Sequence, residues 1–336
     1  MIIAMNINAA KEDIERVIFK IEEQEMKPLN LPGGERTVIG IASAIPPAKR
    51  EPLTNLLLSL PGVDYVKQVS RTFKLASREF QSSDTVVEIK KVKIGGNNLV
   101  IMAGPCAIES KDQLFATARV VKESGAAVLR GGAYKPRSSP YSFQGLGLEG
   151  LKIMKEAGEK FGLVTVTEIL DQHDVETFTA YVDILQIGAR NMQNFPLLVA
   201  VGKTKHPVLL KRGSSASIDE LLLSAEYILN QGNPNVILCE RGVHPLDKTY
   251  IRSTLDISAI PIIKELSHLP IIIDPSHAAG RSTYVPALSK AAVAAGAHGL
   301  IIEVHPDPKT ALCDGSQSLT PKQFTTLSKE LHKTKT

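Results

Sequence analysis

Tryptophan is absent from the chain, and only three of its 336 residues are cysteines. Cys106, Cys239 and Cys313 are widely spaced and odd in number, which argues against a disulfide framework and predicts a reducing, cytoplasmic setting. No apolar run reaches the roughly 18 residues that a membrane helix needs, and the first residues do not resemble a secretory signal. Positive and negative side chains nearly balance, since the net charge is only +4. We therefore expect neither a membrane nor a nucleic-acid partner.

The first seventy residues predict a small α+β domain, because short apolar strands and amphipathic helices alternate there. The six predicted elements have the order β-α-β-β-α-β, which is the split βαβ arrangement of ferredoxin-like domains. They fall at residues 2–7, 10–23, 26–31, 36–43, 47–60 and 63–70. A short polar linker is expected over residues 71–85.

Residues 86–336 predict a (β/α)8 TIM barrel. Eight short apolar runs recur with helical stretches between them, and each is rich in β-branched residues, as strands buried on both faces should be. The runs lie at residues 98–104, 126–132, 163–169, 183–189, 207–213, 235–242, 270–277 and 299–305. A doubly wound sheet is the alternative, but no G-x-G-x-x-G turn follows the first run. A short hairpin over residues 86–98, turning at Gly95, Gly96 and Asn97, is expected before the barrel.

Charged side chains follow almost every predicted strand, at the end where barrel enzymes carry their active sites. Seven of them are cations, which would repel one another unless anions fill the space, and Arg matches phosphate and carboxylate geometry. They are Arg130, Lys135, Arg137, Arg190, Lys211, Arg212 and Arg241. For any single cation, a salt bridge to Glu168, Glu240 or a helix acid is the alternative explanation.

A second set at the same end combines a thiol, an imidazole and two carboxylates. It follows predicted strands one, seven and eight, of which the first and last are neighbours in a closed barrel, and it consists of Cys106, His277, Glu303 and Asp314. Such a mixed set suits Mn, Fe, Co or Zn rather than Ca or Mg. Taken alone, Cys106 would be a small buried hydrophobe and His277 a core histidine. Cys239 is expected in the core, and Cys313 near the metal without a ligand role.

The strand-end motifs follow one another in a recognisable order: AGPCAIES, VLRGGAYKPRSSPYSFQGLG, QIGARNMQNF, LLKRG, LCERG, DPSHAAGR and IIEVHPDP with LCDG. From about residue 86 onward the chain resembles the 3-deoxy-D-arabino-heptulosonate 7-phosphate (DAHP) synthases. The preceding domain resembles the N-terminal extension of their type I β subgroup. The KPRSSPYSF run is the most specific part, because the sister 3-deoxy-octulosonate 8-phosphate synthases carry a different, Asn-containing stretch there.

The resemblance implies a condensation of phosphoenolpyruvate with D-erythrose 4-phosphate that gives DAHP and inorganic phosphate, at the entry to the shikimate pathway. It implies one divalent transition metal per subunit, with Mn favoured, held by Cys106, His277, Glu303 and Asp314. Phosphoenolpyruvate is assigned to Arg130, Lys135, Ala189, Arg190, Lys211 and Arg241. Erythrose 4-phosphate is assigned to Lys135, Pro136, Arg137, Ser138 and Asp314. Lys135 is the expected general acid, and Glu168 would orient or deprotonate the attacking water.

Every assigned residue lies beyond Val86, so residues 1–70 need another role. We expect them to bind tyrosine or phenylalanine as a feedback effector, and we expect a homotetramer. Oligomer contacts or solubility alone are the alternative role of this domain.

Three other functions are alternatives to the DAHP synthase hypothesis. The first is the sister condensation with arabinose 5-phosphate. The second is a Schiff-base aldolase using Lys211, which would need a lysine of lowered pKa among apolar neighbours. The third is a non-catalytic effector-binding protein with a degenerate barrel, against which the complete metal set argues.

Overall fold

The computed structural model describes residues 1–32, 36–41, 43, 45–68 and 72–333 of the chain. The chain divides into two compact units, Met1–Ser83 and Asp84–Thr336. The expected linker was residues 71–85, of which residue 71 lies outside the described part. In the first unit Lys74 Nζ donates to the carbonyl oxygens of Ile41 and Ser43. A Cβ on Gly40 would meet the ring of Phe80. Much of the expected linker therefore packs on the first unit.

The first unit is a four-stranded sheet with two helices. Its strand order is β2-β3-β1-β4, and each pair of neighbouring strands is antiparallel. Its apolar core joins one side of the sheet to both helices, through residues such as Ile3, Met5, Val17, Ile39 and Leu57. The elements are β1 (Ile2–Met5), α1 (Lys11–Glu23), β2 (Pro28–Pro32), β3 (Thr37–Ile41), α2 (Pro47–Leu58) and β4 (Val63–Lys67). This confirms the predicted ferredoxin-like domain.

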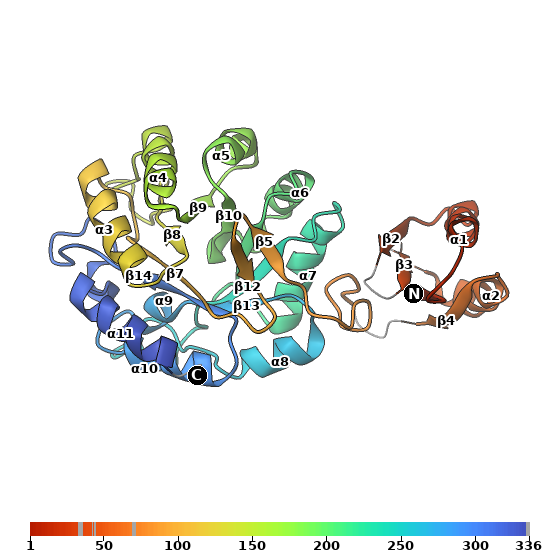
Figure 1. Cartoon of the computed structure of the whole chain (residues 1–336). Helices are drawn as coiled ribbons and strands as arrows, with labels where there is room; N and C mark the ends of the chain where they lie inside the picture. Colours follow the sequence, from red (N-terminus) through yellow and green to blue (C-terminus); the bar gives the residue numbers. More distant parts are fainter. Residues whose placement is uncertain (33–35, 42, 44, 69–71, 334–336) are drawn as a thin grey trace. The chain divides into compact units, whose positions relative to one another are not determined.

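The second unit is a closed barrel of eight parallel strands in chain order, with its helices arranged around it in Figure 1. All eight predicted runs form its strands, and nearly every strand residue is buried, as the β-branched runs required. The strands are β7 (Val100–Gly104), β8 (Val128–Arg130), β9 (Val164–Ile169), β10 (Ile184–Ile187), β11 (Val208–Lys211), β12 (Val236–Glu240), β13 (Ile271–Ile273) and β14 (Gly299–Glu303). The predicted (β/α)8 fold is confirmed.

Helices follow the strands around the barrel. They are α3 (Lys111–Glu123), α4 (Leu148–Phe161), α5 (Val175–Tyr181), α6 (Phe195–Lys203), α7 (Ile218–Leu229), α8 (Ala259–Leu266), α9 (Pro275–Ala279), α10 (Val285–Ala294) and α11 (Pro321–Lys333), with short 3-10 turns η1 (Gln172–Asp174), η2 (Ala189–Asn191) and η3 (Gly315–Gln317). Local signals fix several of their starts. Ser217 and Glu220 form a reciprocal capping box at α7, and Ser110 caps α3. No described helix is long and apolar enough to cross a bilayer.

A hairpin of β5 (Val87–Ile89) and β6 (Val92–Ile94) precedes the barrel. The predicted turn position was wrong: the chain reverses at Lys90 and Lys91, with Lys90 at a φ of +55°, and Gly95 and Gly96 come after the second strand. The strand register explains the difference. It places Val87, Ile89 and Ile94 in one apolar cluster with the inward-facing residues of the barrel strands. Cys239 belongs to that cluster, as expected.

Candidate active site

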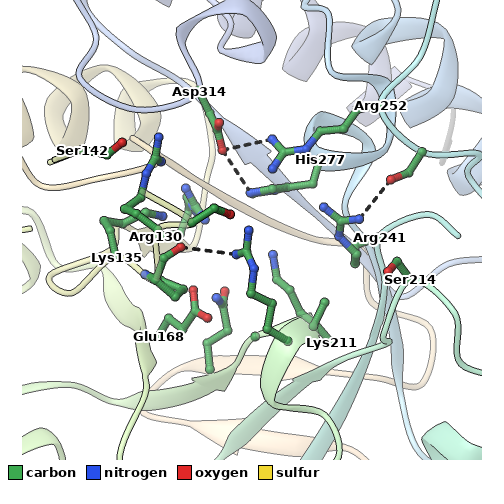
Figure 2. A pocket seen from close by; sticks show the side chains of 18 of the residues that line it. Arg130, Lys135, Ser142, Glu168, Lys211, Ser214, Arg241, Arg252, His277 and Asp314 are labelled. Atoms are coloured by element: carbon green, nitrogen blue, oxygen red, sulfur yellow. Dashed lines mark hydrogen bonds and ion pairs between the residues drawn. The ribbon is translucent and has the colours of Figure 1, made fainter. Parts of the chain in front are cut away.

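A pocket of about 550 Å³ opens at the C-terminal ends of the barrel strands (Figure 2). Most of the residues proposed from the sequence line it, namely Arg130, Lys135, Pro136, Arg137, Ser138, Glu168, Ala189, Arg190, Lys211, Arg241, His277 and Asp314. Cys106 and Glu303 do not line it, because each is about 1% exposed. The barrel geometry therefore brings residues from seven strand ends and their loops into one cavity.

The four expected metal ligands converge at one side of this pocket. Each of Cys106, His277, Glu303 and Asp314 offers an atom, and these atoms all lie within 4.8 Å of one another. His277 Nε2 is 3.3 Å from Glu303 Oε1 and 3.8 Å from Asp314 Oδ2. Cys106 Sγ is 3.4 Å from the same Asp314 oxygen. Four groups from distant parts of the sequence thus surround one small space.

The sequence DPSH builds one side of this cluster locally. Asp274 is the N-cap of α9, Pro275 supplies the first helical residue, and His277 comes three positions after the cap. Asp274 Oδ2 lies 2.8 Å from His277 Nδ1, and Lys211 Nζ lies 2.5 Å from that oxygen. Ser276 Oγ accepts the backbone N–H of Glu303 at 3.0 Å. The same short helix therefore orients the imidazole and fixes the neighbouring carboxylate's backbone.

The donor chemistry of the cluster fits a divalent transition metal. A thiol, an imidazole and two carboxylates are the mixed set such ions take. His277 has Nδ1 within ion-pair distance of Asp274 and presents Nε2 to the cluster, and a carboxylate beside the second ring nitrogen is the usual setting of a metal-bound histidine. Burial alone would lower the pKa of His277, but the carboxylates of Asp274 and Glu303 raise it. Burial alone would raise the pKa of Asp314, but Arg252 and His277 lower it to about 2.

Two thiols meet at this cluster. Cys106 Sγ and Cys313 Sγ are 3.1 Å apart, and Lys135 Nζ lies 3.2 Å from Cys106 Sγ. Both cysteines are free. The contact with Cys313 and burial raise the pKa of Cys106 well above its ordinary range. A buried ammonium group beside the sulfur offers the charge that a thiolate would need.

The cations of the pocket are held in different ways. Arg130 is about 4% exposed, donates to Glu303 Oε1 at 2.9 Å, and also reaches the Pro105 carbonyl at 2.8 Å. Arg241 donates to Ser253 Oγ at 3.0 Å, and no described carboxylate lies within salt-bridge distance of it. In Figure 2, Arg241 and Lys211 lie on one side of the cavity and Arg130 and Lys135 on another. Charge in the pocket is only partly compensated by protein carboxylates.

The loop after β8 folds back on itself over the pocket. Tyr134 and Gly145 form an isolated bridge, and Lys135 N–H donates to the Gln144 carbonyl at 2.9 Å. Arg137 at the far side of this loop donates to Cys313 Sγ at 2.6 Å. The KPRS segment therefore lines the pocket and also contacts Cys313, the residue before Asp314.

One cation in the predicted set is placed elsewhere. Arg212 does not line the pocket, and its guanidinium pairs with Glu240 at 3.0 Å and Asp256 at 2.8 Å. Burial raises the pKa of Glu240 although Arg212 opposes the shift. Consecutive strand residues point to opposite sides, so Lys211 and Arg212 cannot share one direction. For Arg212 the salt-bridge alternative is correct.

Several pocket residues escaped the sequence analysis. Arg252 pairs with Asp314 at 3.2 Å (Figure 2). It also donates to Gln317 Oε1 at 3.0 Å, which joins the candidate metal ligands to η3. It comes twelve residues after the end of β12, within an irregular segment, so no strand-end rule would find it. The others are Ser139, Ser142, Gln186, Gly188, Ser214, His244 and Ser253. Gln186 lies within a strand, and the serines are too common in loops to carry a signal.

Comparison with known proteins assigns both units to one family. The DAHP synthetase I family matches residues 79–336, and the DAHP synthase ferredoxin-like domain matches residues 1–71. A phospho-2-dehydro-3-deoxyheptonate aldolase of Thermotoga maritima is 50% identical over 333 residues, covering 99% of this chain and 97% of that protein. A crystal structure of phospho-2-dehydro-3-deoxyheptonate aldolase (DAHP synthase) from Thermotoga maritima superposes with a TM-score of 0.78 at 49% identity, covering 99% of this chain and 96% of that chain.

The sister group is more distant. A 2-dehydro-3-deoxyphosphooctonate aldolase of Syntrophobacter fumaroxidans is 33% identical over 262 residues, covering 73% of this chain and 90% of that protein. The chain belongs to the DAHP synthetase I family. The family, the fold and the enzyme class predicted from the sequence, a DAHP synthase, are confirmed.

Proposed function

We propose that this chain condenses phosphoenolpyruvate with D-erythrose 4-phosphate to give DAHP and inorganic phosphate. The observation that carries the proposal is one pocket in which cations from several strands face a four-ligand metal cluster. Phosphoenolpyruvate brings a carboxylate and a phosphate, and the aldose brings a second phosphate. A cavity lined by Arg and Lys on opposite sides suits three anionic groups.

Phosphoenolpyruvate is proposed to lie among the cations on the strand ends. They are Arg130, Lys135, Arg190, Lys211 and Arg241, with the backbone of Ala189 beside them. Arg241 is the best candidate for a phosphate contact, because its side chain donates a hydrogen bond to the neutral hydroxyl of Ser253. Lys211 lies against Asp274 instead of in an apolar setting, which disfavours the Schiff-base alternative.

Erythrose 4-phosphate is proposed to lie between the KPRS segment and Asp314. Arg137 and Ser138 would bind its phosphate, while Lys135, Pro136 and Asp314 would contact the aldehyde end and its hydroxyls. All five line the same pocket. Arg137→Ala should therefore raise the KM for erythrose 4-phosphate far more than the KM for phosphoenolpyruvate, since a charged phosphate contact contributes about 1.5–3 kcal/mol. Equal effects on both KM values would contradict this division of the pocket.

The metal is proposed to be a divalent transition ion, with Mn favoured, one per subunit. Cys106, His277, Glu303 and Asp314 would hold it, and when bound it would supply Lewis-acid polarisation of the aldehyde oxygen. Cys106 can act as a metal ligand only while its thiol stays reduced. Because the cytoplasm is a reducing compartment, we place the enzyme there.

The proposed reaction needs one proton donor and one activated water. C3 of phosphoenolpyruvate attacks the aldehyde carbon, and the Lys135 ammonium gives a proton to the aldehyde oxygen, which becomes a hydroxyl. Burial opposes charge on Lys135, but the negative charge of a thiolate at Cys106 or Cys313 raises its pKa, so deprotonation of a neighbouring cysteine favours the ammonium form. Glu168 orients the water that adds at C2 and takes its proton. Loss of phosphate from C2 then leaves the keto group of DAHP.

Phosphate release is the direct test. The purified chain should release inorganic phosphate from phosphoenolpyruvate only when erythrose 4-phosphate is present, and dialysis against EDTA should abolish release until Mn²⁺ is added. Arabinose 5-phosphate is the matched control. Faster turnover with arabinose 5-phosphate would instead assign the chain to the 3-deoxy-octulosonate 8-phosphate synthase reaction. Unchanged turnover after EDTA would contradict the metal proposal.

The first unit is proposed to be regulatory within a homotetramer. None of the residues assigned to chemistry lies in it, and ferredoxin-like domains often bind small effectors, which is an argument by analogy. Tyrosine or phenylalanine at millimolar concentration should lower turnover, and hydrogen exchange should show new protection within residues 1–70. If neither amino acid changes turnover or exchange, the unit has no such role. Light scattering should give four times the chain mass of 36.3 kDa.

A further inference from the structure

The Asp314 carboxylate depends on a loop that has little regular structure of its own. The segment between β14 and α11 contains only the short turn η3, and Asp314 has a left-handed φ of +52°. Aspartate enters that conformation more readily than most non-glycine residues, so the backbone of this loop does not by itself determine where the carboxylate stands. Contacts with other parts of the barrel help to hold it, and Arg252 is one such contact, at 3.2 Å from Asp314 Oδ2.

Glu109 is the side chain that reaches this loop from the Cys106 side. It lies three residues after Cys106, in the loop between β7 and α3. Leu312 N–H donates to Glu109 Oε1 at 2.8 Å, and Glu109 Oε2 lies 3.3 Å from His305 Nε2. The side chains of Glu109 and His305 are only 12% and 6% exposed. One carboxylate thus binds both the start and the end of residues 305–312.

The direction of both hydrogen bonds follows from a third. Asp307 N–H donates to His305 Nδ1 at 3.1 Å, so Nδ1 is an acceptor and Nε2 carries the hydrogen. Glu109 therefore accepts twice, once with each oxygen. A carboxamide cannot replace it, because its NH₂ group would face either the Leu312 N–H or the His305 Nε2–H.

We propose that Glu109 is a positioning residue that ties the Asp314 loop to the Cys106 loop and so sets the spacing of these two metal ligands. His277 and Glu303 sit on α9 and β14 and do not need the tie, whereas Asp314 lies only two residues beyond the Leu312 amide. The inference rests on the proposed metal site and extends it to a residue that does not touch the ligand cluster.

Glu109→Gln tests the tie, and Lys309→Ala is its control, because Lys309 is exposed in the same segment. Mn²⁺ dissociation constants are measured by equilibrium dialysis of the metal-stripped proteins, together with KM for both substrates and the metal-free melting temperature. Loss of a residue that orients a ligand weakens metal binding by about 10- to 100-fold. We expect that loss in Glu109→Gln, with a raised KM for erythrose 4-phosphate, an unchanged KM for phosphoenolpyruvate, and no change in Lys309→Ala.

His305→Asn is the second variant in case Glu109→Gln fails to fold. Its side-chain oxygen can still accept the Asp307 N–H, but it no longer reaches Glu109, so a smaller loss of Mn²⁺ affinity is expected. Wild-type Mn²⁺ affinity in a variant whose metal-free melting temperature has fallen would overturn the inference and leave Glu109 a merely structural residue. If the unmodified chain itself binds no Mn²⁺, the proposed metal site fails, and the inference with it.

Discussion

Asp274 binds His277 twice. Its Oδ1 accepts the His277 backbone N–H at 2.9 Å, and its Oδ2 lies 2.8 Å from the Nδ1 atom of the same residue. Burial alone would raise the pKa of Asp274, but His277 and Lys211 hold it well below its ordinary value. The carboxylate is therefore charged; it caps the start of the helix through a hydrogen bond and places a negative charge beside the imidazole.

Asp274→Asn should weaken Mn²⁺ binding by about 10- to 100-fold. One oxygen can still cap α9, but an NH₂ group then takes the place of Oδ2 and faces both Lys211 Nζ and His277 Nδ1. The measurement is the Mn²⁺ dissociation constant of the metal-stripped protein. Asp171→Asn is the control, because Asp171 Oδ1 contacts both the backbone N–H and the ring Nδ1 of His173 outside the pocket. Equal affinities in the two variants would show that the Asp274 contact does not act on the metal.

Metal affinity should rise with pH. The contact with Cys313 and burial raise the pKa of Cys106, so the metal-free protein holds a thiol at neutral pH. His277, whose pKa Asp274 and Glu303 raise against the effect of burial, also tends to keep its proton. A metal needs the thiolate and the neutral imidazole, so binding releases protons.

The expected slope is up to about tenfold in affinity per pH unit for each proton released. Chelator competition between pH 6 and pH 8 measures it, with the chelator's own protonation corrected. Cys106→Ser should reduce the slope, whereas Cys239→Ala, which changes a thiol of the apolar core, should keep it. A pH-independent dissociation constant would contradict the protonation states described.

Gly188→Ala should lower kcat by displacing Glu168. A Cβ on Gly188 would stand 1.9 Å from Glu168 Oε1, and the carboxylate would have to turn away. The φ of −68° at Gly188 suits alanine, so the variant should fold. The control is Gly213→Ala, where the nearest atom would be 3.4 Å away. The loss in kcat should approach that of Glu168→Gln, and a wild-type kcat would mean that the carboxylate position is unimportant for turnover.

Arg212→Met should destabilise the barrel without changing the KM for phosphoenolpyruvate. Glu240 is fully buried, and removing one partner of a buried ion pair costs about 3–5 kcal/mol. Urea unfolding measures the loss. Lys290→Met, which breaks an exposed pair with Glu330, should cost less than about 1 kcal/mol. A raised KM for phosphoenolpyruvate with an unchanged free energy of unfolding would instead show that Arg212 contributes to substrate binding.

The barrel and most of its pocket could be predicted because a single rule connects them. Strands buried on both faces appear as β-branched runs, and the charged residue at the C-terminal end of each strand lies at the mouth of the barrel. Arg130, Lys211 and Glu303 were all found in this way. The rule does not resolve which of two consecutive residues faces the pocket, and Arg212 was therefore misplaced.

Features that depend on register or on long irregular segments could not be predicted. Gly95 and Gly96 looked like the hairpin turn, but the pairing of Val87 with Ile94 moved the reversal to Lys90 and Lys91. Arg252 reaches the metal cluster from an irregular segment, and only the three-dimensional path of that segment brings it to Asp314. Tertiary contacts, and not local propensity, decide both cases.

The hairpin at the foot of the barrel has a kinetic consequence. Its side chains pack with the inward-facing strand residues into one apolar cluster, and the pocket opens at the opposite, C-terminal end of the strands. Both substrates would enter, and both products would leave, through this same opening. Inorganic phosphate left behind would occupy the cations that the next phosphoenolpyruvate needs, and product phosphate should therefore compete with that substrate.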